Sequence, residues 1–308
     1  MNESVLGPGP AVAAVDIGGT AIKLTVVDSD GRPGPVLRIP TPRAEPEQVA
    51  HAVLRSAADG LRTLAGSAAV TAVGIGAPGV VDDEGHAVFS ENLGWRDVPL
   101  ARLAGDQLAL PVTVVHDVRA AGEAERRLGA GRGLTDVAVV AVGTGIASAV
   151  FLGGAAHTAG GYAGEIGHAV VRPGGEPCAC GNRGCLEATA SSAALARRYT
   201  ARTGTPVSGS ADVLRRARQG DPVAVELWDD AVDALALGLS HVAALLAPEA
   251  IIVGGGLAQA GDDLFIPLQR RLNDYHRLRP VPLLPARLGE DAGVLGAALA
   301  ARDAGGRA

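Results

Sequence analysis

The sequence has few aromatic residues and no excess of positive charge. Phe, Trp and Tyr together make up 3% of its 308 residues, and the formal net charge is −6. Proteins that bind nucleic acids usually present a basic surface and aromatic side chains that stack on bases. These two shortages argue against DNA or RNA as a main partner.

Long hydrophobic runs are absent as well. Two stretches resemble membrane spans, but Gly143-Thr144-Gly145 interrupts 137–152 and several charged residues interrupt 223–252. Neither supplies the roughly 20 continuous apolar residues that cross a bilayer. Residues 1–15 lack the positive charge and the long apolar run of a secretory signal. The sequence therefore predicts a cytoplasmic protein with no membrane association.

Cysteine is rare, and all three cysteines lie close together. Cys178, Cys180 and Cys185 fall within eight positions and follow His168. Three thiolates and one imidazole form a closed tetrahedral ligand set that is typical of structural zinc. The alternative is one disulfide with a free thiol, but cysteines one residue apart bridge poorly and the odd count leaves a thiol over. The sequence predicts a structural Zn²⁺ site.

Two parts of the sequence share one plan of strands and turns. Apolar segments at 11–15 and 21–27 flank one glycine-rich turn, and segments at 136–142 and 146–152 flank another. This repetition predicts an α/β protein of two lobes with a duplicated architecture and a cleft between the lobes. Further strands are expected at 70–75, 112–115 and 250–253, and helices at 47–64, 118–128, 191–199, 221–246 and 293–301.

The two turns have the composition of phosphate-binding loops. The first reads Asp-Ile-Gly-Gly-Thr over 16–20, and the second reads Gly-Thr-Gly over 143–145. Glycine lets backbone N–H groups approach a phosphate, and threonine adds a hydroxyl donor. Tight hairpins also need glycine for conformational reasons. Each turn alone leaves both interpretations open, but one turn in each lobe favours a clamp for nucleotide phosphates.

Two further features also have two interpretations each. Gly254-Gly255-Gly256 follows an apolar strand and could offer a flat surface to a purine ring or form a packing turn before a helix. Asp117 lies between a buried strand and a helix. It could cap that helix or act as the general base that takes a proton from a substrate hydroxyl during phosphoryl transfer.

Two glutamates lie beside the predicted zinc ligands. Glu165 precedes His168 by three residues, and Glu187 follows Cys185 by two. A metal that fixes His168 and Cys185 would hold both carboxylates on a rigid frame. Carboxylates held in this way suit hydrogen bonding to a polyhydroxylated ligand, whereas without the metal they would be ordinary solvated side chains.

These segments, in this order, resemble the ROK family of sugar kinases and sugar-responsive repressors. The resemblance covers nearly the whole chain and is strongest over 161–168 and 178–187. It implies the two-lobed α/β fold of the actin-like ATPases (ribonuclease H-like) with an interlobe cleft. A small α/β domain would span 1–117 and be completed by a C-terminal helix at 293–308. A large domain would span 118–292 and contain the zinc segment at 168–185.

The resemblance also implies roles for individual residues. Asp117 would be the catalytic base, and ATP with Mg²⁺ would be the phosphoryl donor. Sugar contacts would come from Asn92, His116, Asp117, Glu165, His168 and Glu187. The nucleotide would be held by Asp16, Gly18, Gly19, Thr20, Gly143, Thr144, Gly145, Gly254, Gly255 and Gly256. Structural Zn²⁺ would be ligated by His168, Cys178, Cys180 and Cys185.

The expected activity is ATP-dependent phosphorylation of a hexose at the 6-hydroxyl, most simply glucose. Family glucokinases usually have Asn-Asp-Ala-Asn where this chain has His-Asp-Val-Arg at 116–119, so a kinase for an amino or otherwise modified hexose is an alternative. The glycine-poor continuation of the second turn leaves a non-catalytic sugar-binding regulator as another. A repressor would need a helix-turn-helix domain, and only fifteen residues precede Asp16. Family members commonly form dimers or tetramers, so a homo-oligomer is expected.

Overall fold

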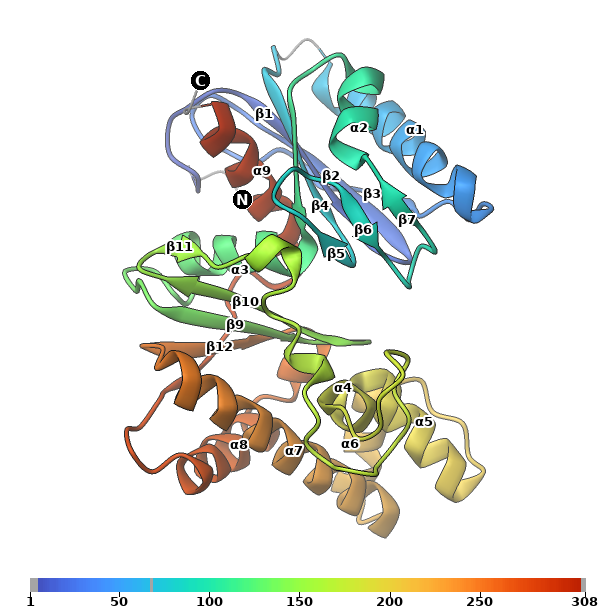
Figure 1. Cartoon of the computed structure of the whole chain (residues 1–308), viewed down its shortest axis with the longest axis vertical. Coiled ribbons are helices and arrows are strands. Elements are labelled where there is room, and N and C mark those ends of the chain that lie inside the picture. The colour runs from blue at the N-terminus through green and yellow to red at the C-terminus, as the bar shows by residue number, and fades with distance from the viewer. Residues whose placement is uncertain (1–4, 67–68, 306–308) are drawn as a thin grey trace. The chain divides into compact units, whose positions relative to one another are not determined.

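The computed structural model describes residues 5–66 and 69–305, which form two compact units (Figure 1). Of the described residues, unit 1 contains 5–66, 69–129, 158–163 and 290–305, and unit 2 contains 130–157 and 164–289. The predicted domains have different borders, because the helix at 117–128 and the segment 158–163 pack with unit 1. Residues 1–4, 67–68 and 306–308, which were assigned to the small domain, lie outside the described residues.

Unit 1 is an α/β unit with one large and one small sheet. Its strands are β1 (Val12–Ile17), β2 (Ala21–Val27), β3 (Leu37–Pro40), β4 (Ala72–Ala77), β5 (Val80–Val81), β6 (Ala87–Phe89), β7 (Arg96–Val98) and β8 (Val112–His116). Its helices are α1 (Pro46–Ala65), α2 (Leu100–Leu108), α3 (Asp117–Leu128) and α9 (Ala292–Gly305), with a short 3₁₀ helix η1 (Ala159–Gly161). The large sheet has the order β3-β2-β1-β4-β8, and β5-β6-β7 form the small sheet.

The large sheet of unit 1 is buried on both faces. Along β1, Ala13, Val15 and Ile17 pack into the core that includes α1, while Val12 and Ala14 pack against α9. Such a strand carries apolar residues on both faces, and β1 is apolar from Val12 to Val15, which is why its sequence does not alternate before Asp16. Helix α9 approaches β4 closely because Gly74 has no side chain: a Cβ there would lie 1.8 Å from the carbonyl oxygen of Ala297.

Unit 2 has a five-stranded sheet and a group of helices. Its strands are β9 (Val137–Val142), β10 (Ile146–Leu152), β11 (Ala155–Ala156), β12 (Ala250–Gly254) and β13 (Leu283–Pro285). Its α-helices are α4 (Leu186–Ala190), α5 (Ser192–Thr203), α6 (Ser210–Arg218), α7 (Pro222–Leu246) and α8 (Asp262–Tyr275). Its 3₁₀ helices are η2 (Ile166–His168) and η3 (Gly256–Ala260), and η4 (Gly289–Asp291) leads into α9. The main core packs the sheet against these α-helices.

The two large sheets have the same topology, which confirms the predicted duplication. The sheet of unit 2 has the order β11-β10-β9-β12-β13. In each sheet the first two strand pairs are antiparallel and the last two are parallel. The predicted hairpins at 11–27 and 136–152 are β1-β2 and β9-β10, and each glycine turn joins the two strands of its hairpin.

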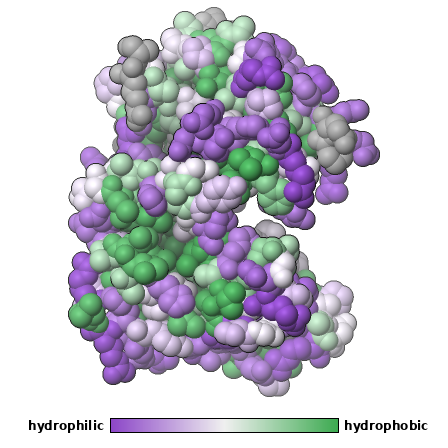
Figure 2. All heavy atoms as spheres, viewed as in Figure 1, coloured by the Kyte–Doolittle hydropathy of each residue, from purple (hydrophilic) through white to green (hydrophobic). Residues whose placement is uncertain are grey.

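The surface is mixed in polarity. On the face shown in Figure 2, hydrophilic side chains surround groups of hydrophobic ones. None of the helices within the described residues combines the length and the apolar character needed to cross a membrane. The stretch 137–152 is instead the hairpin β9-β10, and 223–252 comprises most of helix α7 and part of strand β12. Both stretches contribute to the cores.

Candidate active site

The carboxyl ends of three parallel strands of unit 1 carry two of the predicted site residues. Asp16 of β1 pairs with Gly76 of β4, and Asp117 directly follows β8. A Cβ placed on Gly76 would lie 3.5 Å from Cα of Asp117 and 3.7 Å from Oδ1 of Asp16. The structure therefore brings these two aspartates together at the sheet edge where ligands of open α/β sheets commonly bind.

Asp117 is the first residue of α3, and His116 is the residue that caps this helix. The expected start at residue 118, with Asp117 as the cap, is therefore wrong by one position. Oδ1 of Asp117 accepts a hydrogen bond from the Val118 N–H at 2.7 Å. Burial raises the pKa of Asp117 to about 6, although hydrogen bonds from the backbone lower it. A carboxyl with this pKa is ionised at neutral pH and still basic enough to accept a proton.

Asp16 lies beside Lys23, the only lysine of the chain. Nζ of Lys23 is 3.6 Å from Oδ2 of Asp16 and donates a hydrogen bond to the carbonyl of Glu290 at 2.9 Å. Burial raises the pKa of Asp16 to about 6, the Lys23 ammonium lowers it, and the charge of Asp117 raises it further. Sequence reasoning missed Lys23, although a single lysine just after the first glycine turn was an available signal.

The first glycine turn lies beside Asn92. The Gly18 N–H donates to the carbonyl of Ala21 at 3.0 Å, and the Thr41 hydroxyl donates to the carbonyl of Gly18 at 2.6 Å. A Cβ on Gly19 would lie 3.6 Å from Cβ of Asn92. A cavity of about 310 Å³ opens here, lined by Gly19, Thr41, Pro42, Arg43, Ala44, Val49, Asn92 and Leu93. A larger cavity of unit 1, about 640 Å³, contains none of the predicted site residues, so we give it no role in the site.

His116 and Arg119, which replace the two amide residues of the family pattern, both make contacts within unit 1. Nε2 of His116 lies 3.1 Å from Oδ1 of Asp117, and Nη2 of Arg119 donates to the carbonyl of Gly161 at 3.5 Å. Both side chains are buried. The predicted contact of His116 with a sugar stays a prediction.

The predicted zinc ligands come together in unit 2. The donor atoms of His168, Cys178, Cys180 and Cys185 all lie within 4.8 Å of one another, the only such group of metal-binding side chains in the described residues. Sγ of Cys178 is 3.7 Å from Nδ1 of His168, and the sulfurs of Cys180 and Cys185 are 3.6 Å apart. Zinc–sulfur bonds of about 2.3 Å place tetrahedral ligands about 3.7 Å apart. The donor set fits Zn²⁺.

The state of the cysteines agrees with a metal site. All three are free, so the alternative of a disulfide is wrong for this structure. Burial and the neighbouring sulfurs raise the pKa of the Cys185 thiol to about 12. Binding a metal to Cys185 would therefore displace a proton, as is usual when a thiol becomes a ligand.

The two predicted sugar-binding glutamates lie in unit 2 near these ligands. Oε2 of Glu165 is 3.8 Å from Nε2 of His168, on the ring nitrogen that does not face Cys178. Oε2 of Glu187, in the first turn of α4, accepts a hydrogen bond from the Ile146 N–H at 2.7 Å. Because Ile146 directly follows the second glycine turn, the structure joins Glu187 to that turn, a contact that sequence reasoning did not foresee.

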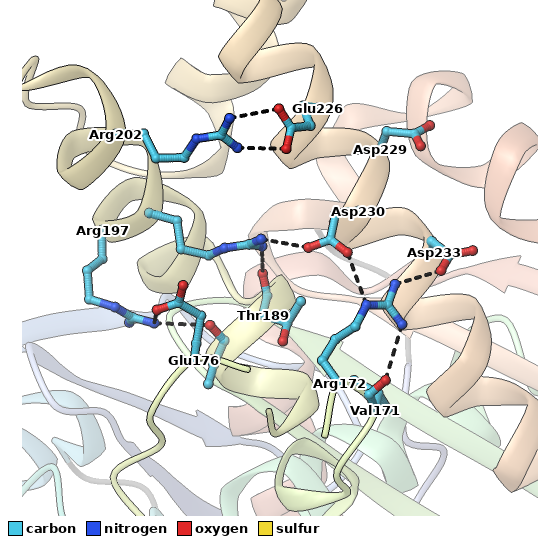
Figure 3. A network of polar contacts seen from close by, with 12 residues as sticks. Val171, Arg172, Glu176, Thr189, Arg197, Arg202, Glu226, Asp229, Asp230 and Asp233 are labelled. Carbon is cyan, nitrogen blue, oxygen red and sulfur yellow. Dashed lines mark hydrogen bonds and ion pairs between the residues drawn. The ribbon is translucent and has the colours of Figure 1, made fainter. Parts of the chain in front are cut away.

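A network of ion pairs attaches the zinc segment to α7 (Figure 3). Arg172 donates to Asp230 at 3.1 Å and to Asp233 at 2.6 Å. Arg198 of α5 donates to Asp230 at 2.6 Å and to the carbonyl of Thr189 at 2.8 Å. Asp230 therefore connects the segment between His168 and Cys178 with the end of α4.

The third glycine segment, Gly254 to Gly256, is explained in part by packing. Gly255 has φ +85°, and a Cβ there would lie 2.5 Å from the carbonyl oxygen of Val142. The helix expected after this segment begins as the 3₁₀ helix η3. The packing alternative accounts for Gly255, and the contact of this segment with a purine stays a prediction.

The sequence matches the family model "ROK family" over residues 12–304. The chain belongs to the ROK family. It is 35% identical to a glucokinase of Streptomyces coelicolor, with 94% of this chain and 96% of that protein aligned. It is 32% identical to an N-acetylmannosamine kinase of Escherichia coli O1:K1 / APEC, with 94% of this chain and 97% of that protein aligned.

The structural comparison agrees with the family assignment. A ROK family glucokinase from Streptomyces griseus, solved in complex with glucose and AMPPNP, superposes with a TM-score of 0.80 at 35% identity. The match covers 95% of this chain and 99% of that chain. Together with the duplicated sheets, this similarity confirms the predicted α/β fold of the actin-like ATPases. The roles of the individual site residues stay predictions.

Proposed function

We propose that this ROK family protein is an ATP-dependent kinase that phosphorylates a hexose at its 6-hydroxyl, with glucose as the preferred acceptor. The observation that carries the proposal is the proximity of Asp16 and Asp117 at one sheet edge, where burial raises the pKa of both to about 6. The glucokinase relative and the solved glucokinase with glucose and AMPPNP support the same activity.

In the proposed reaction Asp117 is the general base. Its carboxylate takes the proton of the 6-hydroxyl while the hydroxyl oxygen forms a bond to the γ-phosphorus of ATP. The bond between the γ-phosphorus and the β–γ bridging oxygen breaks, and ADP leaves. His116 lies against the same carboxylate and fixes its orientation.

Binding of the nucleotide is assigned to residues of both glycine turns. The backbone N–H groups of Gly19 and Gly145 would face phosphate oxygens, because oriented amides stabilise negative charge. Asp16 supplies a carboxylate oxygen of the kind that Mg²⁺ prefers. Mg²⁺, when bound with ATP, supplies positive charge that offsets the negative charge of the transferring phosphoryl group.

Zinc is proposed as a structural cofactor on the sugar side. His168, Cys178, Cys180 and Cys185 would hold the ion, and four protein ligands leave no open position for catalysis. Glu165 and Glu187 would then present their carboxylates to sugar hydroxyls from a fixed backbone.

A second candidate function is phosphorylation of an N-acetylated or amino hexose. The replacement of two amide side chains by His116 and Arg119 favours it, as does the N-acetylmannosamine kinase relative. The two candidates share the same base and the same donor and differ only in the sugar.

The test is a substrate panel with the purified protein, ATP and Mg²⁺. ADP release is measured with glucose, mannose, fructose, glucosamine, N-acetylglucosamine and N-acetylmannosamine, and phosphorus NMR locates the phosphate on the product. We expect the highest kcat/KM with glucose and phosphate on the 6-oxygen. A tenfold or greater preference for an N-acetylated sugar would favour the second candidate. Absence of ADP release with every sugar would contradict both and favour a non-catalytic sugar-binding regulator.

A further inference from the structure

The second glycine turn is held at both ends by the segment that follows the last zinc ligand. At one end, the Ile146 N–H donates to Oε2 of Glu187 at 2.7 Å. At the other end, the Ser192 N–H donates to the carbonyl of Gly143 at 2.8 Å. Glu187 lies in α4, which begins directly after Cys185, and Ser192 is the first residue of α5, so the segment 186–192 reaches both sides of the turn.

The 3₁₀ helix η2, which carries the zinc ligand His168, also contacts Ile146. A Cβ on Gly167, the residue before His168, would lie 2.0 Å from the carbonyl oxygen of Ile146 and 3.4 Å from Cβ of Glu187. The backbone of Ile146 is thus enclosed between η2 and α4, one on its carbonyl side and one on its N–H side. These two elements carry or adjoin the zinc ligands His168 and Cys185.

Gly145 keeps this arrangement tight. A Cβ at that position would lie 2.5 Å from Oε2 of Glu187, so a larger residue would displace the carboxylate from the Ile146 N–H. The absence of a side chain at position 145 therefore leaves room for the carboxylate of Glu187 as well as for any bound phosphate. A carboxylate that accepts a short hydrogen bond from the backbone fixes that backbone more firmly than a neutral acceptor does.

We infer that Glu187 is a positioning residue for nucleotide binding in addition to its proposed sugar contact. One oxygen holds the second glycine turn in the conformation that receives phosphates, and the other is available to a sugar hydroxyl. The inference rests on the proposed function, because it takes the turn at 143–145 to bind ATP. A residue that only contacted the sugar would leave nucleotide affinity unchanged when no sugar is present.

The test is calorimetric titration of the zinc-loaded protein with AMPPNP and Mg²⁺ in the absence of sugar. We expect Glu187→Ala to weaken AMPPNP binding about tenfold, since a buried N–H loses its charged acceptor. Glu187→Gln keeps an amide oxygen for the Ile146 N–H and should bind AMPPNP within about threefold of the wild type. Both variants should bind glucose more weakly. Glu165→Ala is the matched control, because Glu165 lies beside the zinc ligand His168 and has no hydrogen bond to the turn.

Two further measurements distinguish an effect of Glu187 on the second glycine turn from an effect of lost zinc. Zinc content is measured for each variant, and hydrogen exchange of the Ile146 amide should be faster in Glu187→Ala than in Glu165→Ala at equal zinc content. Wild-type affinity for AMPPNP in Glu187→Ala, or an equal loss in Glu165→Ala, would overturn the inference while leaving the proposed function intact. Failure of the wild-type protein to bind AMPPNP would instead overturn the proposed function and the inference with it.

Discussion

Nε2 of His116 lies 3.1 Å from Oδ1 of Asp117, where β8 ends and α3 begins. The His116 side chain is 9% exposed, so this contact is made inside the protein. His116 therefore contacts the proposed base directly, and its predicted contact with the sugar stays a prediction.

Replacing His116 by asparagine should change the rate more than the choice of sugar. We expect kcat to fall about three- to tenfold, because the carboxylate of Asp117 loses a contact that fixes its orientation. The ratio of kcat/KM between glucose and N-acetylmannosamine should stay within about twofold. Steady-state kinetics with both sugars checks this, and a tenfold change in that ratio would show that His116 determines sugar specificity.

Activity should fall in acid with an apparent pKa near 6. Burial raises the pKa of Asp117 from its ordinary value of 3.8 to about 6, so the ionised base is lost as the pH falls through that value. We expect kcat/KM to be flat above pH 7 and to fall about tenfold per pH unit below pH 6. Asp16, whose pKa burial also raises to about 6, can make the fall steeper. Initial rates between pH 5 and pH 8 measure the profile, and full activity at pH 5 would contradict the assignment of the base.

Removing zinc should destabilise the protein and weaken sugar binding together. We expect a chelator to lower Tm by about 5–10 °C, because the segment between His168 and Cys185 loses the zinc ion that holds it together. Glucose affinity should fall by about tenfold as Glu165 and Glu187 lose their support. Calorimetry before and after chelation, with metal analysis, checks both effects, and added zinc should restore them. An unchanged Tm in metal-free protein would rule out a structural role for the ion.

The ion pairs on α7 offer a separate test of how the zinc segment is held. Asp230→Ala removes the partner shared by Arg172 and Arg198 and should lower the free energy of unfolding by about 1–2 kcal/mol. Asp229→Ala is the control, because Asp229 is on the same helix but pairs with Arg271 of α8, outside the zinc segment. Its cost should be below about 1 kcal/mol, since the Asp229 carboxylate is exposed to solvent.

Urea unfolding with zinc analysis compares the two variants. Asp230→Ala should also bind zinc more weakly, whereas Asp229→Ala should not. Equal losses of stability and unchanged zinc affinity in both would mean that the network in Figure 3 does not support the metal site.

Local patterns predicted much of the fold. The hairpins at 11–27 and 136–152 and the long helices α1 and α7 were all expected, because apolar residues follow one another or recur there at helical spacing. The small sheet β5-β6-β7 and helices α2, α4, α6 and α8 were not expected. The strands of that sheet have at most three residues, and α6 has nine residues that are mostly polar, so neither gives a long apolar segment.

The end of β4 shows why glycine misled the sequence analysis. The strand was expected to end at residue 75, yet Gly76 and Ala77 continue it and pair with Val115 and His116. Asp16 and Asp117 both lie within ordinary contact distance of a Cβ placed on Gly76, and this proximity is visible only when the three strands are assembled.

In the candidate site, too, local sequence predicted some features and missed others. Residue types within a short stretch predicted the donor set of the zinc site, since three cysteines and a histidine have few other uses in such proximity. The bond between Ile146 and Glu187 joins residues 41 positions apart, and no local pattern indicates it. Lys23 and Asp16, and likewise His116 and Asp117, are close in sequence. Their contacts nevertheless depend on the direction in which each side chain points, which the sequence does not show.

The most direct test of the account is Asp117→Asn, assayed for phosphorylation and for glucose binding in the same preparation. Asparagine keeps the size of the side chain and cannot take the proton, so kcat should fall by about 10²–10⁴-fold while the Kd for glucose, measured by calorimetry, changes less than about threefold. At pH 8 the variant should melt no lower than the wild type, because it removes a charge whose burial raises the pKa of Asp117. Retention of more than a tenth of the wild-type kcat would contradict the assignment of Asp117 as the base of a sugar kinase.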